Sequence, residues 1–312
     1  QDKVLYMLEK NKDKVISGGE ISRHLGVSRN AVWKAINSLK KSGNSIESLR
    51  NSGYRLAGDN DGLSKLIIEE QLTTERLGST IEIFETIHST NTFLKEQDLS
   101  ILQEGYVVLA DEQTSGRGRL NRYFFSPKRS GIYFSVLLKP NLPPEKTRLL
   151  TLCAAVAVCN ALQNVCGLIS QIKWVNDIYV EDKKLCGILT EASISAEMQS
   201  IDYVIVGIGI NTGQIPKEIK NIATSVLTVT GKQGFRNKLV AEVLNQLEKI
   251  YLGYILVGNE SAILSAYSEK LIYINKKVVV KIYDGAFEAT VLGIDETGSL
   301  IVKNDEGKVL HI

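Results

Sequence analysis

The sequence predicts an α+β protein of three parts: a small basic helical module over residues 1–58, a larger mixed domain over 63–270, and an all-β segment over 271–312. A length of 312 residues suits two or three domains. Residues 1–57 hold 11 Lys and Arg against 5 Asp and Glu, although the whole chain carries only +2. Several strand patterns then follow one another through tight polar turns, which favours a mainly antiparallel sheet. The basic start indicates an anion-binding module, with nucleic acid as the obvious partner.

The N-terminal module has the pattern of a helix-turn-helix. Apolar residues mark a short helix at Val4–Leu8, and a second helix is expected over Gly19–Leu25. Gly26 then makes the turn, and Ser28 is suited to cap a third helix. The β-branched Val32 would pack behind that third helix, which is the expected recognition helix.

A hairpin over Ile46–Leu56, with Asn51–Gly53 at its turn, completes a winged helix-turn-helix. The alternative is a three-helix interaction module with a solvated basic face. The third helix would reach base edges or backbone, while the hairpin would contact mainly phosphates. The predicted DNA-binding residues are Ser28, Arg29, Asn30, Trp33, Lys34, Arg50 and Arg55.

Residues 57–62 have the composition of a linker, and a mixed domain follows them. Its expected strands are Ile81–Glu85, Tyr106–Ala110, Ile132–Leu138, Ile169–Trp174, Ile178–Val180, Leu185–Leu189 and Tyr203–Ile210, and its helices lie near 89–97, 144–166 and 236–257. Because these strands arrive consecutively, the sheet should be mixed or antiparallel.

The four cysteines follow neither a metal-binding nor a disulfide spacing. Three of them lie in the apolar helix 144–166, where we expect buried thiols in a reducing, cytoplasmic compartment. The longest apolar run, Leu149–Cys159, is too short to cross a bilayer, so no membrane partner is expected.

Residues 112–122, Glu-Gln-Thr-Ser-Gly-Arg-Gly-Arg-Leu-Asn-Arg, are the most informative stretch. Arginine offers a planar fork of donors for carboxylate and phosphate oxygens. Glycine lets a backbone approach a ligand closely but leaves the empty loop loose. We therefore expect a loop that an anionic ligand orders; the alternative is a solvated basic loop.

Three further clusters carry candidate chemistry. Ser89-Thr90-Asn91 opens a helix after a strand, where it could cap that helix or bind a small ligand. The stretch from Lys173 to Asp177 precedes Lys184 and Gly187 across a hairpin, although a solvated face is equally possible there. Gly207-Ile-Gly209-Ile-Asn211 ends an apolar strand, where glycines leave room for a flat group or mark a bulge.

Common nucleotide motifs do not explain these clusters. Gly207-x-Gly209 has Thr212 where a dinucleotide fingerprint needs glycine, and Gly116-x-Gly118 has Asn121 there. The sequence also contains no Gly-x-x-x-x-Gly-Lys-Ser/Thr phosphate loop. Any nucleotide must therefore be bound by a different arrangement of residues.

Taken in order, the clusters resemble the motifs of biotin protein ligases. With the helix-turn-helix, the whole chain resembles the bifunctional type, which is both biotin ligase and biotin operon repressor. Three residues depart from the family pattern: Val175 replaces a frequent proline, Phe124 a tryptophan of some members, and His88 a common acidic residue.

The resemblance implies a class II synthetase-like central domain with ATP and biotin as substrates and Mg²⁺ accompanying ATP. Lys184, Arg119 and Asp177 are the implied catalytic residues: Lys184 contacts the carboxylate and α-phosphate, Arg119 adds charge, and Asp177 orients or deprotonates a carrier lysine. No metal ligand is assigned. The residues implied to bind biotin and biotinyl-AMP are Ser89, Thr90, Asn91, Gln113, Gly116, Arg117, Arg119, Arg122, Phe124, Lys184, Gly187, Gly207, Gly209 and Asn211.

The implied partners are a biotin carboxyl carrier protein or carboxylase biotin domain, biotin operator DNA, and a second copy when biotinyl-AMP is bound. The C-terminal strands, expected at Val278–Ile282, Ala289–Ile294, Leu300–Lys303 and Val309–Ile312 with one turn at Asp284-Gly285, resemble the family's SH3-like β-barrel. That barrel would help bind ATP or the carrier; the alternative is a packing module without chemistry.

Two rival functions remain open at this point. A ligand-sensing transcription factor with an inactive ligand domain would be expected to lack Lys184 or the Gly/Arg loop, yet both are present. A lipoate ligase shares the acyl-adenylate chemistry. The helix-turn-helix and the loop favour biotin, but residue chemistry alone does not choose between the two acids.

Overall fold

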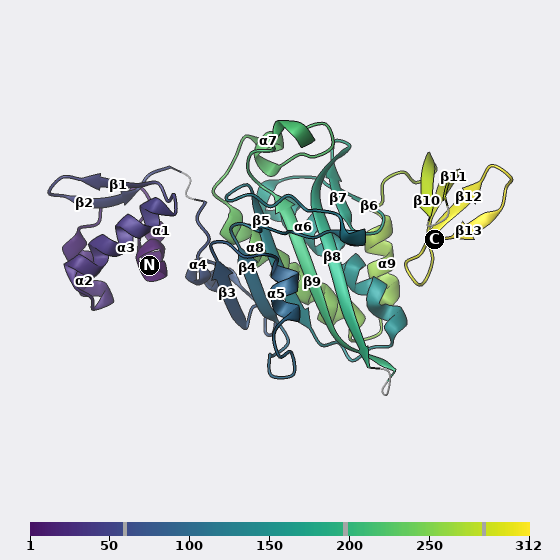
Figure 1. The fold of residues 1–312 in the computed structure, drawn as a ribbon, viewed down its shortest axis with the longest axis horizontal. Coiled ribbons are helices and arrows are strands. Elements are labelled where there is room, and N and C mark those ends of the chain that lie inside the picture. Colours follow the sequence, from purple (N-terminus) through teal and green to yellow (C-terminus); the bar gives the residue numbers. More distant parts are fainter. Residues whose placement is uncertain (59–60, 196–198, 283–284) are drawn as a thin grey trace.

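The computed structural model describes residues 1–312 apart from 59–60, 196–198 and 283–284. A helical module, a central sheet with helices and a small β segment follow one another along the long axis (Figure 1). The predicted α+β class is confirmed, with its winged helix-turn-helix and mixed central sheet. The linker predicted over 57–62 lies partly outside the described residues.

The N-terminal module contains α1 (Asp2–Lys10), α2 (Gly18–Leu25), α3 (Arg29–Lys41), β1 (Ile46–Leu49) and β2 (Gly53–Leu56). Gly26 takes the left-handed conformation, with φ of 66°, and ends α2 as predicted. Ser28 Oγ accepts from the Ala31 N–H at 3.1 Å and starts α3. Leu49 pairs with Gly53, so the hairpin turn comprises residues 50–52, and Gly53 already belongs to β2.

The central sheet has the order β3-β4-β5-β9-β8-β7-β6. Only β3 and β4 pair in parallel, and the other five pairings are antiparallel. The strands are β3 (Thr80–Phe84), β4 (Tyr106–Ala110), β5 (Gly131–Leu138), β6 (Gln171–Lys173), β7 (Asp177–Val180), β8 (Lys183–Ser195) and β9 (Ser200–Asn211).

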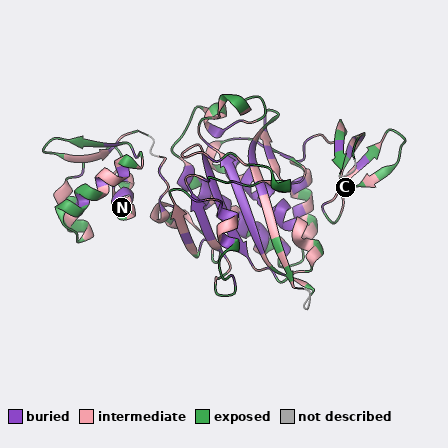
Figure 2. Ribbon diagram, in the orientation of Figure 1, coloured by how far each residue is buried: buried purple, intermediate pink, exposed green. Residues whose placement is uncertain are grey.

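Helices cover the two faces of this sheet unequally. The long helix α6 (Thr147–Cys166) packs against β8 and β9 and contacts both α8 (Arg236–Ile250) and α9 (Glu260–Ser268). The short α5 (Thr90–Lys95) covers part of the opposite face, where Leu94 joins a smaller apolar cluster. The main core therefore lies between the sheet and α6, as the buried residues in Figure 2 show. The remaining helices are α4 (Lys65–Gln71) and α7 (Val226–Thr230), with single turns at Arg119–Asn121, Pro144–Lys146, Lys217–Ile219 and Tyr251–Ile255.

The segment Pro144–Cys166 is long and apolar enough to cross a membrane by length and composition alone. However, 72% of its most apolar window is buried inside the protein, as in a core helix. Cys153 and Cys159 are buried there, and burial raises the pKa of both thiols, that of Cys159 to about 11. These two thiols are small core residues, as predicted, whereas Cys166 at the end of α6 is only partly buried.

The C-terminal segment is a four-stranded antiparallel meander of β10 (Lys277–Ile282), β11 (Gly285–Ile294), β12 (Leu300–Asn304) and β13 (Val309–His311). The turn predicted at Asp284-Gly285 lies partly outside the described residues. Trp174 Nε1 donates to the Gly298 carbonyl at 3.0 Å, and Arg148 donates to Ser299. These contacts hold the meander against the end of the central sheet.

Candidate active site

A cavity of about 380 Å³ brings together most of the predicted site residues. It lies beside α5, on strands β5, β8 and β9, and the Gly/Arg loop contributes to its wall. The predicted residues that line it are Ser89, Thr90, Asn91, Gln113, Arg117, Arg119, Arg122, Phe124, Asp177, Lys184, Gly187, Gly207 and Gly209.

One part of the cavity wall is neutral, polar and buried. Gln113 Oε1 accepts from the Thr90 backbone N–H at 2.9 Å, and Gln113 Nε2 donates to Ser126 Oγ at 2.9 Å. Ser135 Oγ lies 2.7 Å from Thr90 Oγ1 and donates to Asn91 Oδ1 at 2.5 Å. These bonds fix the side chains in place before any ligand arrives, which limits the ordering cost of binding.

Glu191 anchors this polar wall from β8. Asn91 Nδ2 donates to one carboxylate oxygen at 2.8 Å, and Lys95 Nζ lies 2.9 Å from the other. Burial alone would raise the pKa of Glu191, but the hydrogen bonds from Lys95 and Asn91 outweigh it and hold the pKa below its ordinary value. Glu191 therefore orients Asn91 as a carboxylate.

Three glycines leave room above the sheet. A Cβ at Gly207 would overlap Asn91 Oδ1, so the polar wall needs glycine there. Gly187 and Gly209 are direct partners across β8 and β9. A Cβ at Gly209 would lie 2.5 Å from the Phe124 ring. The flat group that lies over Gly209 in this structure is the ring of Phe124, a side chain of the protein itself.

The Gly/Arg loop is a tight hairpin against the cavity. Gly118 N–H donates to the Arg122 carbonyl at 2.7 Å, and Phe124 N–H donates to the Gly116 carbonyl at 2.9 Å. At its tip Leu120 has a φ of 55° and is 85% exposed. Arg119 Nη1 donates to Asn176 Oδ1 at 3.3 Å, which ties the loop to the segment before β7.

Cations from three elements converge on the cavity. Lys184 Nζ lies 2.7 Å from Asp177 Oδ1 and 6.0 Å from the centre of the Phe124 ring. The loop supplies Arg117, Arg119 and Arg122, and β10 of the C-terminal meander supplies Lys281. Among the described residues that line the cavity, Asp177 is the only carboxylate, so the wall is strongly cationic.

Two predicted residues lie outside the cavity lining. Gly116 faces the Phe124 carbonyl and Ser126, where a Cβ would clash, so it shapes the loop. Asn211 Nδ2 donates to the Thr224 carbonyl at 3.1 Å, and the Thr224 N–H donates to the Lys184 carbonyl at 2.9 Å. Asn211 thus supports Lys184 through Thr224.

The structure adds residues that the sequence did not single out as ligand contacts. Trp174 and Asn176 line the cavity, and their presence in a predicted cluster was a usable signal. The Trp174–Val175 peptide bond is cis. Ser135, Glu191 and Lys281 carried no motif, because each enters the site through a strand pairing or a domain contact.

The predicted DNA-binding residues gather on α3 and the hairpin. Trp33 is 55% exposed on α3, and Arg29, Asn30 and Lys34 are also exposed. Ser28 serves as the helix cap. Arg50 is exposed in the hairpin turn, whereas Arg55 Nη2 lies 2.6 Å from Glu47. The basic face that the sequence predicted is therefore present on the recognition helix.

Comparisons with known proteins agree with this arrangement. Residues 83–211 match the biotin/lipoate A/B protein ligase family, residues 1–55 match a helix-turn-helix domain, and residues 273–312 match the biotin protein ligase C-terminal domain. The bifunctional ligase/repressor BirA of Bacillus subtilis is 38% identical over 94% of this chain and 90% of its own length. BirA of Escherichia coli is 27% identical over 93% of this chain and 88% of its own.

The solved structures show the same likeness. The biotin protein ligase of Aquifex aeolicus, in complex with biotin and ATP, superposes with a TM-score of 0.65 and 31% identity, covering 75% of this chain and 95% of that one. Because the Bacillus relative matches at this identity over nearly its whole length, the chain belongs to the biotin protein ligase family, in its bifunctional ligase/repressor form.

Proposed function

We propose that this chain is an ATP-dependent ligase that forms biotinyl-5′-AMP and transfers biotin to a lysine of a carboxylase biotin carrier domain. The observation that carries this proposal is a single cavity with two kinds of wall, one neutral and polar and one cationic. Biotin has matching chemistry, because its ureido ring is uncharged and rich in hydrogen-bonding groups while its side chain ends in a carboxylate. ATP adds further anionic charge at the cationic wall.

Thr90, Ser89 and Gln113 would hold the ureido ring at the polar wall. A carboxylate oxygen of biotin would then attack the α-phosphorus of ATP, the bond to the bridging oxygen would break, and pyrophosphate would leave. Two anions must approach each other for this step, so positioning and electrostatic stabilisation dominate. Lys184 would contact both groups, and the loop arginines would add charge around them.

In the second step the amine of a carrier lysine attacks the anhydride carbonyl, and AMP leaves. The amine must be neutral to react, so a carboxylate beside it is useful as an acceptor for its proton. Asp177 pairs with Lys184 across 2.7 Å and lines the same cavity. Once Lys184 engages the adenylate, Asp177 would be free to orient or deprotonate the carrier lysine.

Mg²⁺ would enter this site with ATP. Within the described ranges no group of three or more His, Cys, Asp or Glu side chains could hold a metal ion. Mg²⁺ commonly keeps several waters and binds through substrate phosphates with one or two carboxylates. The single carboxylate of the lining, Asp177, fits a metal that the nucleotide carries, and the metal would neutralise phosphate charge there.

We assign Lys281 to the β- and γ-phosphates of ATP, since it brings a cation to the cavity from β10 of the C-terminal meander. Lys281→Ala should raise the KM for ATP about fivefold, because one solvent-accessible contact to an anion is worth about 1 kcal/mol. The KM for biotin should stay within twofold. Pyrophosphate release at varied ATP measures both constants.

Lys277→Ala is the matched control for Lys281→Ala. Lys277 lies on the same strand four residues earlier, pairs with Glu288 and Asp305, and is not part of the cavity lining. Its removal should leave the KM for ATP unchanged. An unchanged KM for ATP in Lys281→Ala would remove this assignment.

We further propose that biotinyl-AMP shifts the protein toward a homodimer that binds a palindromic operator. The recognition helix is exposed, and the loop tip presents Leu120 and the 63% exposed Tyr123 to solvent. Ordering this loop over the adenylate would lower the entropic cost of dimerisation. A dimer would then place two recognition helices on the two half-sites of the palindrome, one helical turn or a multiple of it apart.

The ligase proposal is tested by incubating the protein with Mg-ATP, an apo-carrier domain, and either biotin or lipoate. Mass spectrometry of the carrier should show a single biotinyl addition and no lipoyl addition. Lys184→Ala, run in parallel, identifies any label that arises without the enzyme's chemistry. A carrier that gains a lipoyl group and no biotinyl group would show that the protein is a lipoate ligase. A carrier that stays unmodified with both acids would favour a ligand-sensing transcription factor without ligase activity.

A further inference from the structure

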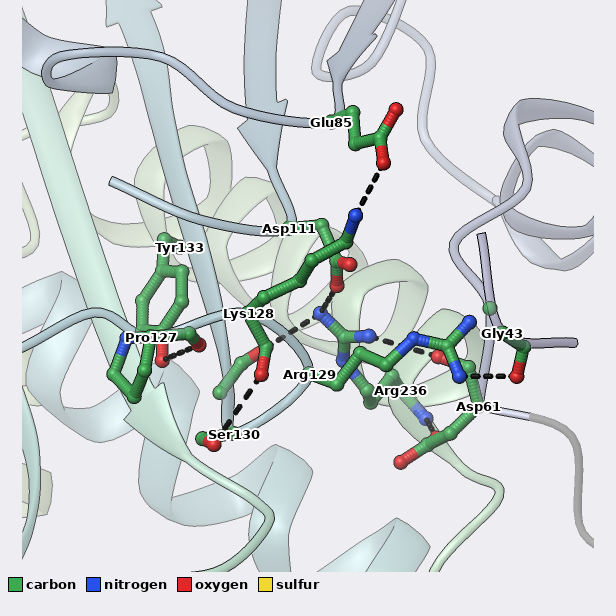
Figure 3. Close-up of polar contacts among 12 residues, drawn as sticks. Gly43, Asp61, Glu85, Asp111, Pro127, Lys128, Arg129, Ser130, Tyr133 and Arg236 are labelled. Atoms are coloured by element: carbon green, nitrogen blue, oxygen red, sulfur yellow. Dashed lines mark hydrogen bonds and ion pairs between the residues drawn. The ribbon is translucent and has the colours of Figure 1, made fainter. Parts of the chain in front are cut away.

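One side chain of the ligase domain, Arg129, contacts the recognition helix directly. Arg129 lies in the turn that precedes β5 and reaches across the domain junction (Figure 3). Its two terminal nitrogens donate to the backbone carbonyls of Ser42 and Gly43. These carbonyls lie at the C-terminal end of α3, where the helix macrodipole and free carbonyls favour a cation.

The turn that carries Arg129 is held rigidly. Tyr133 Oη donates to the Pro127 carbonyl at 3.1 Å, and the Ser130 N–H donates to the same carbonyl at 3.2 Å. Lys128 pairs with Glu85 beyond β3. Arg129 itself has a φ of 62°, a left-handed conformation that a non-glycine residue keeps only when its surroundings impose it. The ligase domain therefore aims this guanidinium at α3.

The same turn begins at the ligand cavity. Ser126 Oγ accepts from Gln113 Nε2 at 2.9 Å, and the Gln113 N–H donates to the Ser126 carbonyl at 3.0 Å. Gln113 in turn accepts from Thr90 in the polar wall. Only two residues, Pro127 and Lys128, lie between Ser126 and Arg129, so a short, hydrogen-bonded path joins the cavity to the recognition helix.

Other contacts attach the DNA-binding module without this connection. The Asp2 carboxylate accepts from the Ser64 hydroxyl and from the Leu66 N–H at 3.1 Å, which joins α1 to α4. Tyr6 Oη donates to Glu70 at 3.2 Å on the same two helices. These contacts hold the module near the sheet, and they come from α4. The Arg129 contacts differ, because among the described contacts across the junction they come from the segment that follows the Gly/Arg loop.

We propose that Arg129 is a positioning residue for DNA binding, which sets the angle of the recognition helix according to the state of the ligand loop. This inference rests on the proposed repressor function. The 13 residues of α3 act as a lever, with Arg129 at the C-terminal end and the DNA-facing Arg29 and Asn30 at the N-terminal end. A helix of this length spans roughly 20 Å, so a tilt of roughly 10° would move that end by roughly 3 Å, a full hydrogen-bond length.

The test compares the wild type, Arg129→Ala and Lys128→Ala. A duplex containing an inverted repeat is first selected from a random-sequence pool with the wild-type protein, biotin and Mg-ATP. Each protein is then titrated onto this duplex with and without biotin plus Mg-ATP, and pyrophosphate release is measured alongside. Alanine replaces Arg129 rather than glycine, because glycine would also relax the left-handed backbone.

For Arg129→Ala, we expect the ligand-dependent gain in duplex affinity to fall by on the order of tenfold, within the usual range of coupling between sites. Pyrophosphate release should stay within twofold of the wild type, which also shows that the ligase domain is folded. Lys128→Ala removes the same charge from the neighbouring position, where the partly exposed side chain pairs with Glu85. It should keep most of the gain, because Tyr133 and the Ser130 N–H still hold the turn. Arg129→Lys, which keeps a donor, should restore part of it.

An equal loss of duplex affinity with and without ligand would overturn the proposal, since it would show a fixed structural contact. An unchanged gain in Arg129→Ala would overturn it as well. If the wild-type protein selects no duplex, or binds it equally in both states, the repressor function itself fails and the proposal fails with it. Only the first two outcomes reject the Arg129 coupling while leaving the repressor intact.

Discussion

Lys184→Ala is expected to lower the rate of adenylation by about 10²-fold or more, as for the loss of one preorganised electrostatic stabiliser. The ammonium group lies at the cationic wall, 2.7 Å from Asp177 and above the face of Phe124. Gly187 leaves this position open, because a Cβ there would lie 3.1 Å from Lys184 Nζ. The backbone is fixed by bonds to the carbonyl of Ile222 and the N–H of Thr224, so the loss should fall on chemistry.

Lys183→Ala is the matched control for this variant. Lys183 precedes Lys184 on β8, is exposed, and points to the opposite side of the strand, because successive strand residues alternate. Its removal changes the net charge equally and should leave the rate of pyrophosphate release within twofold. If Lys184→Ala retains a near-native rate while still binding biotin, the transition-state role belongs to the loop arginines instead.

The order of the structural elements could be predicted because buried strands and long amphipathic helices have distinct periodicities. Strand β4 was predicted with its observed bounds, and the recognition helix followed from one cap and one turn glycine. Helix α4 was missed because it is only seven residues long and buries a single apolar residue, Ile68, too little for a periodic pattern. Helices α7 and α9 were missed as well.

Strand ends were harder to predict than strand centres. Strand β8 was expected to end at Leu189 but continues to Ser195, since its polar second half still pairs with β9 at the exposed end of the sheet. The reverse holds for β6, where Ile169 is 81% exposed and the paired strand covers only Gln171–Lys173. For β8 the apolar pattern stops where burial stops although pairing continues, and for β6 an exposed isoleucine extends the pattern beyond the paired residues. The strand is defined by backbone pairing in both cases.

The candidate site could be predicted where its chemistry is concentrated in local motifs, as in the Gly/Arg loop and the Lys184 segment. Residues brought in by distant pairings left no local signal. Lys281 lies far along the chain from the cavity's other cations, and its strand, Lys-Val-Val-Val-Lys-Ile, carries no site motif. Arg129 similarly belongs to a turn whose importance depends on where α3 lies in space.

Arg236→Met is expected to lower the free energy of unfolding by about 3–5 kcal/mol, because it leaves the partly buried Asp111 carboxylate and two backbone carbonyls without their donor. The Arg236 side chain is fully buried at the start of α8. Its Nη2 donates to Asp111 Oδ1 and to the Gly131 carbonyl, both at 2.7 Å, and Nη1 donates to the Asp61 carbonyl at 2.8 Å (Figure 3). Methionine fills similar space but satisfies none of these acceptors. Urea unfolding followed by circular dichroism measures the loss.

The loss should also depend on pH. Burial raises the pKa of Asp61, and Arg236 opposes that rise. Without Arg236 the folded-state pKa of this carboxyl rises further, and a carboxyl with a raised folded pKa destabilises the fold once it is ionised. That penalty disappears as the carboxyl becomes protonated, so the deficit of Arg236→Met should narrow as the pH falls from neutral toward the ordinary pKa of an aspartate, about 4.

Two further variants separate the charge effect from packing. Lys238→Met replaces an exposed cation two residues later on the same helix and should change the free energy of unfolding by less than about 0.5 kcal/mol. Adding Asp111→Asn to Arg236→Met removes the orphaned carboxylate and should recover part of the loss, since contacting residues do not act additively. No recovery, together with no pH dependence, would mean that Arg236 stabilises the fold by filling volume and not by pairing charge.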